Sequence, residues 1–412
     1  MKAVSNAVDS ERLWDDLMAL AGFGAREDGG VCRHALSSED IAARSWLIGK
    51  ARERDYSIAA DDAANLFITR AGRDNALPPV LAGSHMDSQP AGGKFDGAYG
   101  VLAAFEALRA LDDAGIETAR PVTCVAWTNE EGGRFHVPCT GSRAFVSGAV
   151  SDPAQTDDAG ISLESALRST LDAAPDIERI APGFPVHAYV EPHIEQGPVL
   201  EREELPIGVV TGIQGVRWFT VRVEGEPGHA GTVPQASRKD AFQAAMRAIA
   251  ALNTLMADTD DIVRFTVGHL SIEPNSPNTI PAAVRFSIDF RHPDAAVLDE
   301  RGGKVADIIA EAVQPCTADT QLTTSLEPVA FPDPVTSAIS QAADGAGLAH
   351  KPLASGAFHD AAHIASACPS GMIFIPCRGG LSHHPDEWAE PEACTAGARV
   401  LAGALAQLAE TN

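Results

Sequence analysis

The stretch Gly83–Gly97, with the sequence GSHMDSQPAGGKFDG, constrains the fold of this 412-residue chain more than any other. The apolar run just before it, residues 79–82, is short and bounded by turn residues, which predicts a buried strand. The run after it, Ala98–Leu111, has apolar residues at helical spacing. His85 and Asp96 are therefore expected on a loop between a buried strand and a helix, which is where open α/β sheets bind ligands.

A second polar loop follows a second predicted strand. Residues 121–127, PVTCVAW, predict another buried strand, which leads directly into TNEEGG. This alternation of strand, loop, helix, strand and loop is typical of an α/β domain. Adjacent residues at a strand end point to opposite sides, so one carboxylate of Glu130 and Glu131 can bind a metal while the other handles a proton.

The pattern of apolar and polar residues changes near residue 212. Between residues 212 and 328, alternating apolar and polar residues predict antiparallel strands, and strong helical patterns separate them. The α/β pattern then returns. The sequence therefore predicts an α/β domain with a compact α+β domain inserted into it. The expected boundaries are 1–211 for the first part of the α/β domain, 212–328 for the insertion and 329–412 for the second part.

Charge and cysteine content exclude several kinds of function. The formal net charge of −25 disfavours nucleic-acid binding, because an acidic surface repels phosphate backbones. Seven cysteines, an odd number without a CxxC pair, indicate reduced thiols in a cytoplasmic protein. We expect no membrane association, since no apolar run is long enough to span a bilayer and the N-terminus lacks an apolar signal region.

The strand-end residues together suit a metal site. Three histidines, an aspartate that can bridge and a glutamate are suitable ligands for two borderline divalent ions such as Zn, Mn, Co or Ni. No zinc-finger spacing is present, so these ligands must converge through folding. The candidates are His85, Asp96, Glu130, Glu131, His193 and either His383 or His384.

Several longer motifs occur in a fixed order along nearly the whole chain. Besides Gly83–Gly97 they are WTNEEGGRF (127–135), EPHIEQGPVLE (191–201), GHAGTVP (228–234), PNSPNTIP (274–281), DFRHPD (289–294), SGAFHDA (355–361) and GGLSHHPDE (379–387). With them the chain resembles the metal-dependent M20-type amidohydrolases of the N-carbamoyl-L-amino-acid hydrolase, β-ureidopropionase and allantoate amidohydrolase group. The resemblance implies a metallopeptidase-like catalytic domain that carries an inserted dimerisation, or lid, domain.

The resemblance also implies roles for the residues of the α/β domain. Asp87 would hold the His85 ring. Glu130 would be the general base, which activates the attacking water and then protonates the leaving nitrogen. His383 is preferred to His384 because it directly follows the serine of the SH motif. The implied metal ligands are His85, Asp96 and His193 for one ion, and Asp96, Glu131 and His383 for the other, with Asp96 bridging.

Substrate recognition is implied for residues of both domains. Arg291 of the inserted domain would grip the substrate carboxylate with its guanidinium fork, and Asn278 would hold polar groups of the substrate. His229 would reach the active site of the partner subunit and stabilise the oxyanion, so that the homodimer is the functional form. The remaining candidates are Gln196 and His359 on the carbamoyl side, and Gln214 at the hinge.

Three positions depart from the pattern of the group without removing a ligand. Gly133 stands where serine is frequent, Ala282 replaces a usual glycine, and Phe358 replaces a glycine beside His359. Phe358 is expected to narrow the pocket.

The implied reaction is hydrolysis of the ureido C–N bond of an N-carbamoyl-L-amino acid or N-carbamoyl-β-alanine. The products are the amino acid, carbon dioxide and ammonia. Allantoate amidohydrolase is the nearest alternative. An aminoacylase or dipeptidase is a second, which the HIEQGP and NTIP motifs disfavour. A metal-free binding protein on the same scaffold is a third, which the intact ligand set disfavours.

Overall fold

The chain forms two compact units, described here for residues 2–411 from a computed structural model. The larger unit comprises Met1–Thr211 and Phe331–Asn412, and the inserted unit comprises Gly212–Ala330. The sequence placed these changes after residues 211 and 328. The mixed α/β fold class is confirmed.

The mixed sheet of the larger unit has the order β7-β17-β6-β3-β4-β2-β1-β5, with β16 paired to β7. Strand β15, at the end of the inserted segment, also pairs with β7. The four central strands β17, β6, β3 and β4 are parallel. Every residue of β3 and β4 is buried, as expected for strands covered on both faces. The strands are β1 (Ser57–Ala60), β2 (Leu66–Arg70), β3 (Val80–His85), β4 (Val122–Trp127), β5 (Glu178–Arg179), β6 (Ala188–Ile194), β7 (Ile207–Ile213), β15 (Val329–Ala330), β16 (His350–Ser355) and β17 (Ser370–Ile375).

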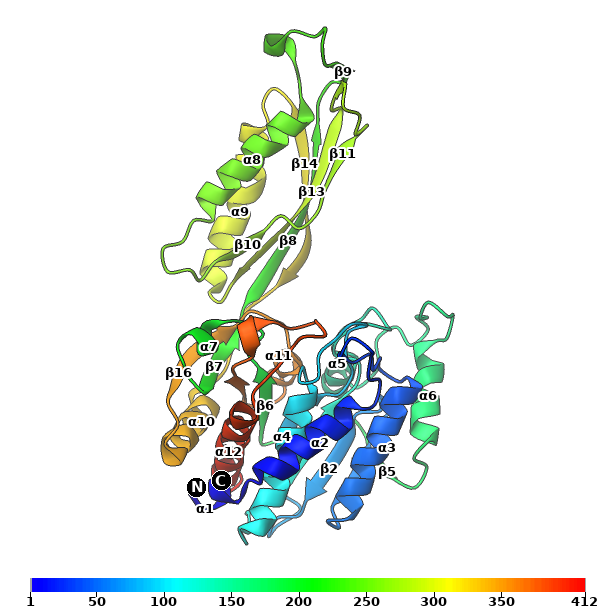
Figure 1. Ribbon diagram of the computed structural model, residues 1–412, viewed down its shortest axis with the longest axis vertical. Coiled ribbons are helices and arrows are strands. Elements are labelled where there is room, and N and C mark those ends of the chain that lie inside the picture. The colour runs from blue at the N-terminus through cyan, green and yellow to red at the C-terminus, as the bar shows by residue number, and fades with distance from the viewer. Residues whose placement is uncertain (1, 412) are drawn as a thin grey trace. The chain divides into compact units, whose positions relative to one another are not determined.

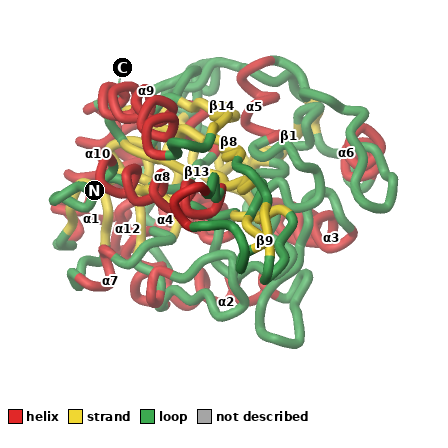
Figure 2. Tube along the Cα trace, turned by 90° about the horizontal axis from the view of Figure 1, so that it is seen from above, coloured by secondary structure: helices red, strands yellow, loops and turns green. Residues whose placement is uncertain are grey.

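Helices cover this sheet, with α4 at the centre of the core (Figure 1). All residues of α4 from Ala98 to Leu111 are buried, and small alanines let the helix pack closely against β3 and α12. The helices are α1 (Lys2–Ala7), α2 (Ser10–Ala21), α3 (Ser38–Arg52), α4 (Ala98–Asp113), α5 (Thr140–Ser147), α6 (Leu163–Asp172), α7 (Val199–Arg202), α10 (Asp333–Ala346), α11 (Asp360–Ile364), η2 (Arg378–Gly380) and α12 (Pro391–Leu408). Loops join most of these elements (Figure 2).

The inserted unit has a core of its own. Its main sheet has the order β10-β13-β8-β14, with β11 paired to β13, and α8 and α9 pack on one face. Inward residues of β8 and β13, such as Val221 and Phe286, alternate with more exposed ones. The elements are β8 (Gly215–Glu224), β9 (Gly228–His229), η1 (Gln235–Ser237), α8 (Ala241–Leu255), β10 (Arg264–Thr266), β11 (Leu270–Glu273), β12 (Thr279–Ile280), β13 (Ala283–His292), α9 (Ala295–Ala312) and β14 (Thr317–Leu326).

Some elements were not expected from the sequence. Strand β14, TADTQLTTSL, lies at a sheet edge with most residues at least partly exposed, so it lacks the apolar alternation that marks a half-buried strand.

All seven cysteines are free. Among residues 2–411, no helix combines the length and the apolarity that crossing a bilayer requires.

Candidate functional site

The candidate site lies where the four parallel strands end. Because parallel strands point the same way, their carboxyl ends meet at one edge of the sheet. His85 is the last residue of β3, and His193 is the next-to-last residue of β6. Glu131 follows β4 by four residues, and His383 lies in the loop after β17. The residues expected to converge do so.

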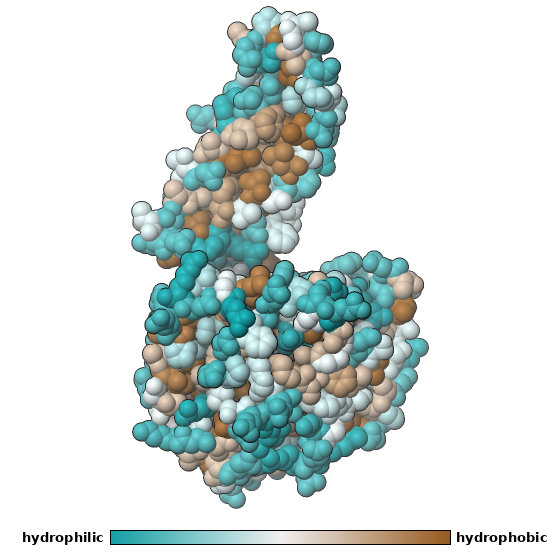
Figure 3. Space-filling view, in the orientation of Figure 1, coloured by the Kyte–Doolittle hydropathy of each residue, from teal (hydrophilic) through white to brown (hydrophobic). Residues whose placement is uncertain are grey.

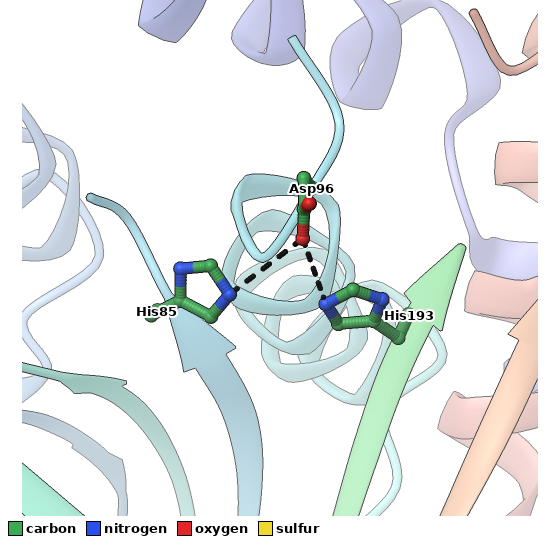
Figure 4. A group of neighbouring side chains, drawn as sticks. All are labelled: His85, Asp96 and His193. Atoms are coloured by element: carbon green, nitrogen blue, oxygen red, sulfur yellow. Dashed lines mark ion pairs between the residues drawn. The ribbon is translucent and has the colours of Figure 1, made fainter. Parts of the chain in front are cut away.

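Asp96 lies between the histidines of the strands (Figure 4). Its Oδ1 is 3.1 Å from Nε2 of His193 and 3.7 Å from Nε2 of His85. All three side chains are buried. Asp96 occupies the loop between β3 and α4, and Gly97 follows it with a φ of 63°. A Cβ at Gly97 would collide with the His85 ring, so the approach of loop and ring requires glycine there.

A second group shares Asp96. Its Oδ2 is 3.3 Å from Nε2 of His383, which is also 3.3 Å from Oε2 of Glu131. Gln89 donates a hydrogen bond of 2.8 Å to the same Glu131 oxygen. In each group, His85–Asp96–His193 and Asp96–Glu131–His383, the ligand atoms lie within 4.8 Å of one another. The His383 side chain is 51% exposed, whereas those of Asp96 and Glu131 are 5% exposed.

Asp87 organises the neighbouring backbone. Its carboxylate accepts hydrogen bonds from the backbone N–H groups of Glu130 (3.3 Å) and Glu131 (3.2 Å). The His85 ring contacts the Asp87 carbonyl oxygen, at 3.0 Å from Nδ1, while the carboxylate is 3.8 Å away. Asp87 therefore contacts the His85 ring chiefly through its backbone, and its carboxylate fixes the loop that carries the two glutamates.

Glu130 points to the first group. Its Oε2 is 3.5 Å from Nε2 of His85, and the thiol of Cys139 lies 3.7 Å from its Oε1. Burial raises the pKa of Glu130 well above its usual range, and the negative charges of Asp360 and Glu131 add to the effect. This carboxyl group is suitably placed to accept and return a proton beside the two groups.

The charges of the site fit divalent cations. Burial, followed by the charge of Asp96, raises the pKa of Glu131 to about 8. Burial opposes a charge on His193, but the hydrogen bond and charge of Asp96 raise its pKa to about 9. Several carboxylates buried together are costly without compensating cations. Carboxylate oxygens and imidazole nitrogens in groups of three are donors that Zn, Mn, Co and Ni accept.

Gln196 and His359 lie beside the cluster. The Gln196 amide donates to Oδ2 of Asp96 (3.0 Å) and to the hydroxyl of Ser382 (3.1 Å). The His359 ring packs on His193 at 4.5 Å between centroids, and its Nε2 is 2.9 Å from the hydroxyl of Ser355.

Three further positions, His384, Phe358 and Gly133, lie near the site. His384 is exposed and accepts a hydrogen bond from the Asp386 N–H, and it belongs to neither group. Phe358, expected to narrow the pocket, packs its ring against the His363 ring, with 5.3 Å between the ring centroids. A Cβ at Gly133 would make only ordinary contacts, so this site has room for the serine that is frequent there.

The other predicted substrate residues belong to the inserted unit. His229 on β9 pairs with Thr279 on β12, and the Ala230 N–H donates to the Asn278 carbonyl. The exposed side chains of His229 and Asn278 therefore lie on the same small two-stranded antiparallel sheet. Arg291 donates from Nε and Nη2 to the Asp289 carboxylate at 2.9 and 2.8 Å. The Oε1 atom of Gln214 is buried and has no hydrogen-bond partner among residues 2–411.

Sequence reasoning assigned no role to several residues near the cluster. The Ser382 hydroxyl lies within hydrogen-bond distance of Asp96 (2.8 Å) and of Glu387 (3.0 Å), and Cys139 lies against Glu130. Ser382 and Glu387 lie within the GGLSHHPDE motif, which was the available signal.

The fold and the cluster define a hydrolase with a metallopeptidase-like catalytic unit of mixed α/β structure and an inserted α+β unit. Residues 81–407 match the family model described as Peptidase family M20/M25/M40. The chain belongs to this family and is a hydrolase of carbon–nitrogen bonds, as the sequence predicts.

Relatives cover nearly the whole chain. An N-carbamoyl-L-amino-acid amidohydrolase of Rhizobium meliloti is 38% identical over 98% of this chain and 97% of its own. An allantoate amidohydrolase of Bacillus subtilis (strain 168) is 34% identical over 99% and 98%. The crystal structure of an amidase of the hydantoinase/carbamoylase family from Burkholderia multivorans is 40% identical over 98% of both chains, with a TM-score of 0.92.

We predict that Gly97→Ala reduces hydrolytic turnover by about 100-fold, because a displaced His85 and Asp96 lose their mutual geometry. Gly115→Ala is the matched control, since Gly115 has a φ of 64° but open space around its Cβ position. Both variants should lose at least about 1–2 kcal/mol of stability because of the positive φ, and Gly97→Ala should lose more because its Cβ collides with His85. Steady-state kinetics and thermal unfolding measure the two effects. Equal activity of the two variants would refute the role of Gly97.

Proposed function

We propose that this enzyme hydrolyses the ureido C–N bond of N-carbamoyl-L-amino acids. One water is consumed, and the products are the amino acid, carbon dioxide and ammonia. The observation that carries the proposal is the convergence of His85–Asp96–His193 with Asp96–Glu131–His383 around one aspartate. Relatives named N-carbamoyl-L-amino-acid amidohydrolase support the substrate class, and N-carbamoyl-β-alanine, which also carries a ureido group and a carboxylate, is the alternative substrate. The reaction is thus that of a hydrolase of linear amides, not of peptide bonds.

Each of the two groups would hold one divalent ion. His85 and His193 would bind the first, Glu131 and His383 the second, and Asp96 would be shared between them. When bound, such ions polarise a carbonyl and lower the pKa of water. Zn, Mn, Co and Ni all suit these donors.

Glu130 would transfer the proton. Its carboxylate takes a proton from the water that attacks the ureido carbon, and it returns that proton to the leaving nitrogen. The C–N bond breaks as the nitrogen is protonated, which leaves a carbamic acid that decomposes to carbon dioxide and ammonia. Asp87 supports this step because its carboxylate holds the Glu130 N–H, and Gln196 and His359 would line the carbamoyl side.

The inserted unit would bind the rest of the substrate. The planar fork of Arg291, oriented by Asp289, suits the substrate carboxylate, and Asn278 would hold polar groups. We propose that Gln214 contributes from the hinge. These roles rest on the motifs PNSPNTIP and DFRHPD.

We propose that the enzyme is a homodimer in which His229 acts on the active site of the partner subunit. Hydrophobic surface over α8 supports an interface on the inserted unit (Figure 3), and Met246 of that helix is 47% exposed. The seven free thiols support a reducing, cytoplasmic compartment.

A substrate panel tests the function. We expect ammonia release from N-carbamoyl-L-amino acids, loss of activity after chelation, and recovery with Zn or Mn. The panel includes N-carbamoyl-β-alanine, allantoate and N-acetyl amino acids. Turnover of allantoate alone would favour the second candidate, which the Bacillus subtilis relative supports. Activity that survives complete metal removal would contradict the binuclear centre.

Mixed dimers test Glu130 and His229 together. Glu130→Gln and His229→Ala should each lower kcat by about 100-fold or more as homodimers. When equal amounts are co-assembled, half of the dimers are mixed, and one site in each mixed dimer combines an intact Glu130 with an intact His229 from the other subunit. Activity should therefore recover to about one quarter of wild type. Without recovery, His229 does not act across subunits.

Arg291→Ala should raise KM for N-carbamoyl amino acids by about 10- to 100-fold, because a charge-assisted pair is lost. Arg285→Ala is the matched control, since Arg285 lies on the same strand and face and is exposed. Substrate analogues with a carboxamide in place of the carboxylate should bind both variants alike. An unchanged KM for Arg291→Ala would remove its anchoring role.

A further inference from the structure

Glu387 joins two of the three loops that carry ligands of the second group, those of Asp96 and His383. It lies between β17 and α12, and its side chain is buried. Its Oε1 accepts hydrogen bonds from the backbone N–H groups of Phe95 (2.9 Å) and Asp96 (3.0 Å). Its Oε2 accepts one from the Ser382 hydroxyl at 3.0 Å. One carboxylate thus binds the backbone of the ligand Asp96 and of its neighbour Phe95, and also Ser382, the neighbour of the ligand His383.

The backbone of Glu387 closes the turn that follows His383. Its N–H donates to the His384 carbonyl at 3.0 Å, and His383, just before this turn, has a left-handed φ of 54°. The chain also makes room for the Glu387 carboxylate, because a Cβ at Gly93 would collide with it. Residues of both loops therefore favour the contact between the Glu387 carboxylate and the loop that carries Asp96.

Glu387 itself belongs to neither group of ligand atoms. Its oxygens face donors of the protein, and two of those donors are backbone N–H groups. A buried N–H that loses its acceptor is destabilising, so the loop would shift to find another partner. Such a shift moves Asp96 and His383 relative to each other.

The two groups differ in how much they depend on this contact. His85 and His193 belong to buried strands of the central sheet, whose ladder holds them without Glu387. His383 is on a loop, and its side chain is 51% exposed. Metal ligands need a geometry fixed to a fraction of an ångström, and residues on loops obtain it from their supporting contacts.

We propose that Glu387 is a positioning residue that sets the affinity of the second ion, the one assigned to Asp96, Glu131 and His383. This inference rests on the proposed function, because it requires the binuclear centre. The first ion shares Asp96, but its other two ligands, His85 and His193, lie on strands of the sheet, so it depends on Glu387 less.

The test is calorimetric titration of the metal-free enzyme with Zn²⁺, which reads binding without activity. Wild type should bind two ions per chain. Glu387→Ala should weaken one of them by about 10- to 100-fold and leave the other within about threefold of wild type. Its profile should match that of His383→Ala, not that of His193→Ala.

Two variants separate positioning from general disruption. Glu387→Gln should bind Zn²⁺ nearly as wild type does, because the amide oxygen can accept from both N–H groups while the NH₂ faces the Ser382 hydroxyl. Asp386→Ala, an exposed change in the same loop, should have no effect. If Glu387→Ala fails to fold, Ser382→Ala should weaken the same ion, by less.

The possible failures are distinguishable. A wild-type enzyme that binds no Zn²⁺ would overturn the proposed function and this inference with it. Two ions in wild type with unchanged binding in Glu387→Ala, or with both ions weakened alike, would overturn the role of Glu387 alone. An unchanged Ser382→Ala, where it replaces Glu387→Ala, has the same meaning.

Discussion

The site depends on one buried carboxylate, that of Asp96. Burying a charge is costly unless other groups compensate for it, and here the compensation comes from several elements at once. His85 and His193 approach one oxygen, while His383, Gln196 and Ser382 approach the other. These partners come from three distant stretches of the sequence, at and after the ends of β3, β6 and β17. The fold must therefore bring these three strand ends together before Asp96 can be buried.

The parallel arrangement of β17, β6, β3 and β4 meets this requirement. It places two ligands on rigid, fully buried strands and the others on loops that follow strands. The strand-borne ligands are fixed by the sheet ladder. The loop-borne ligands need additional contacts, which Asp87, Gln89 and Ser382 supply through hydrogen bonds. This division explains why the same centre combines deeply buried side chains with the half-exposed His383.

The sequence predicted the parts of this arrangement that leave a local pattern. Apolar runs marked β3 and β4, and helical periodicity marked α4, because these elements are buried along their length. The polar edge strand β14 lacks such a pattern and was missed. The candidate ligands could be proposed because they follow apolar runs, and the motifs of the family assigned them to two groups, whose side chains the fold brings together. The contact between Glu387 and the Asp96 loop joins residues about 290 positions apart, so no local spacing announces it.

Asp87 explains how two neighbouring glutamates acquire different surroundings. Both N–H groups bind the same carboxylate, and Asn129 before them has a left-handed φ of 53°. The backbone turns there, so Glu130 faces His85 and Cys139, while Glu131 faces His383 and Gln89. The general base proposed for Glu130 would have to lie close to the ions without binding them. Because the Asp87 carboxylate binds the N–H groups of both glutamates, it lets Glu130 and Glu131 meet these different requirements although they are neighbours.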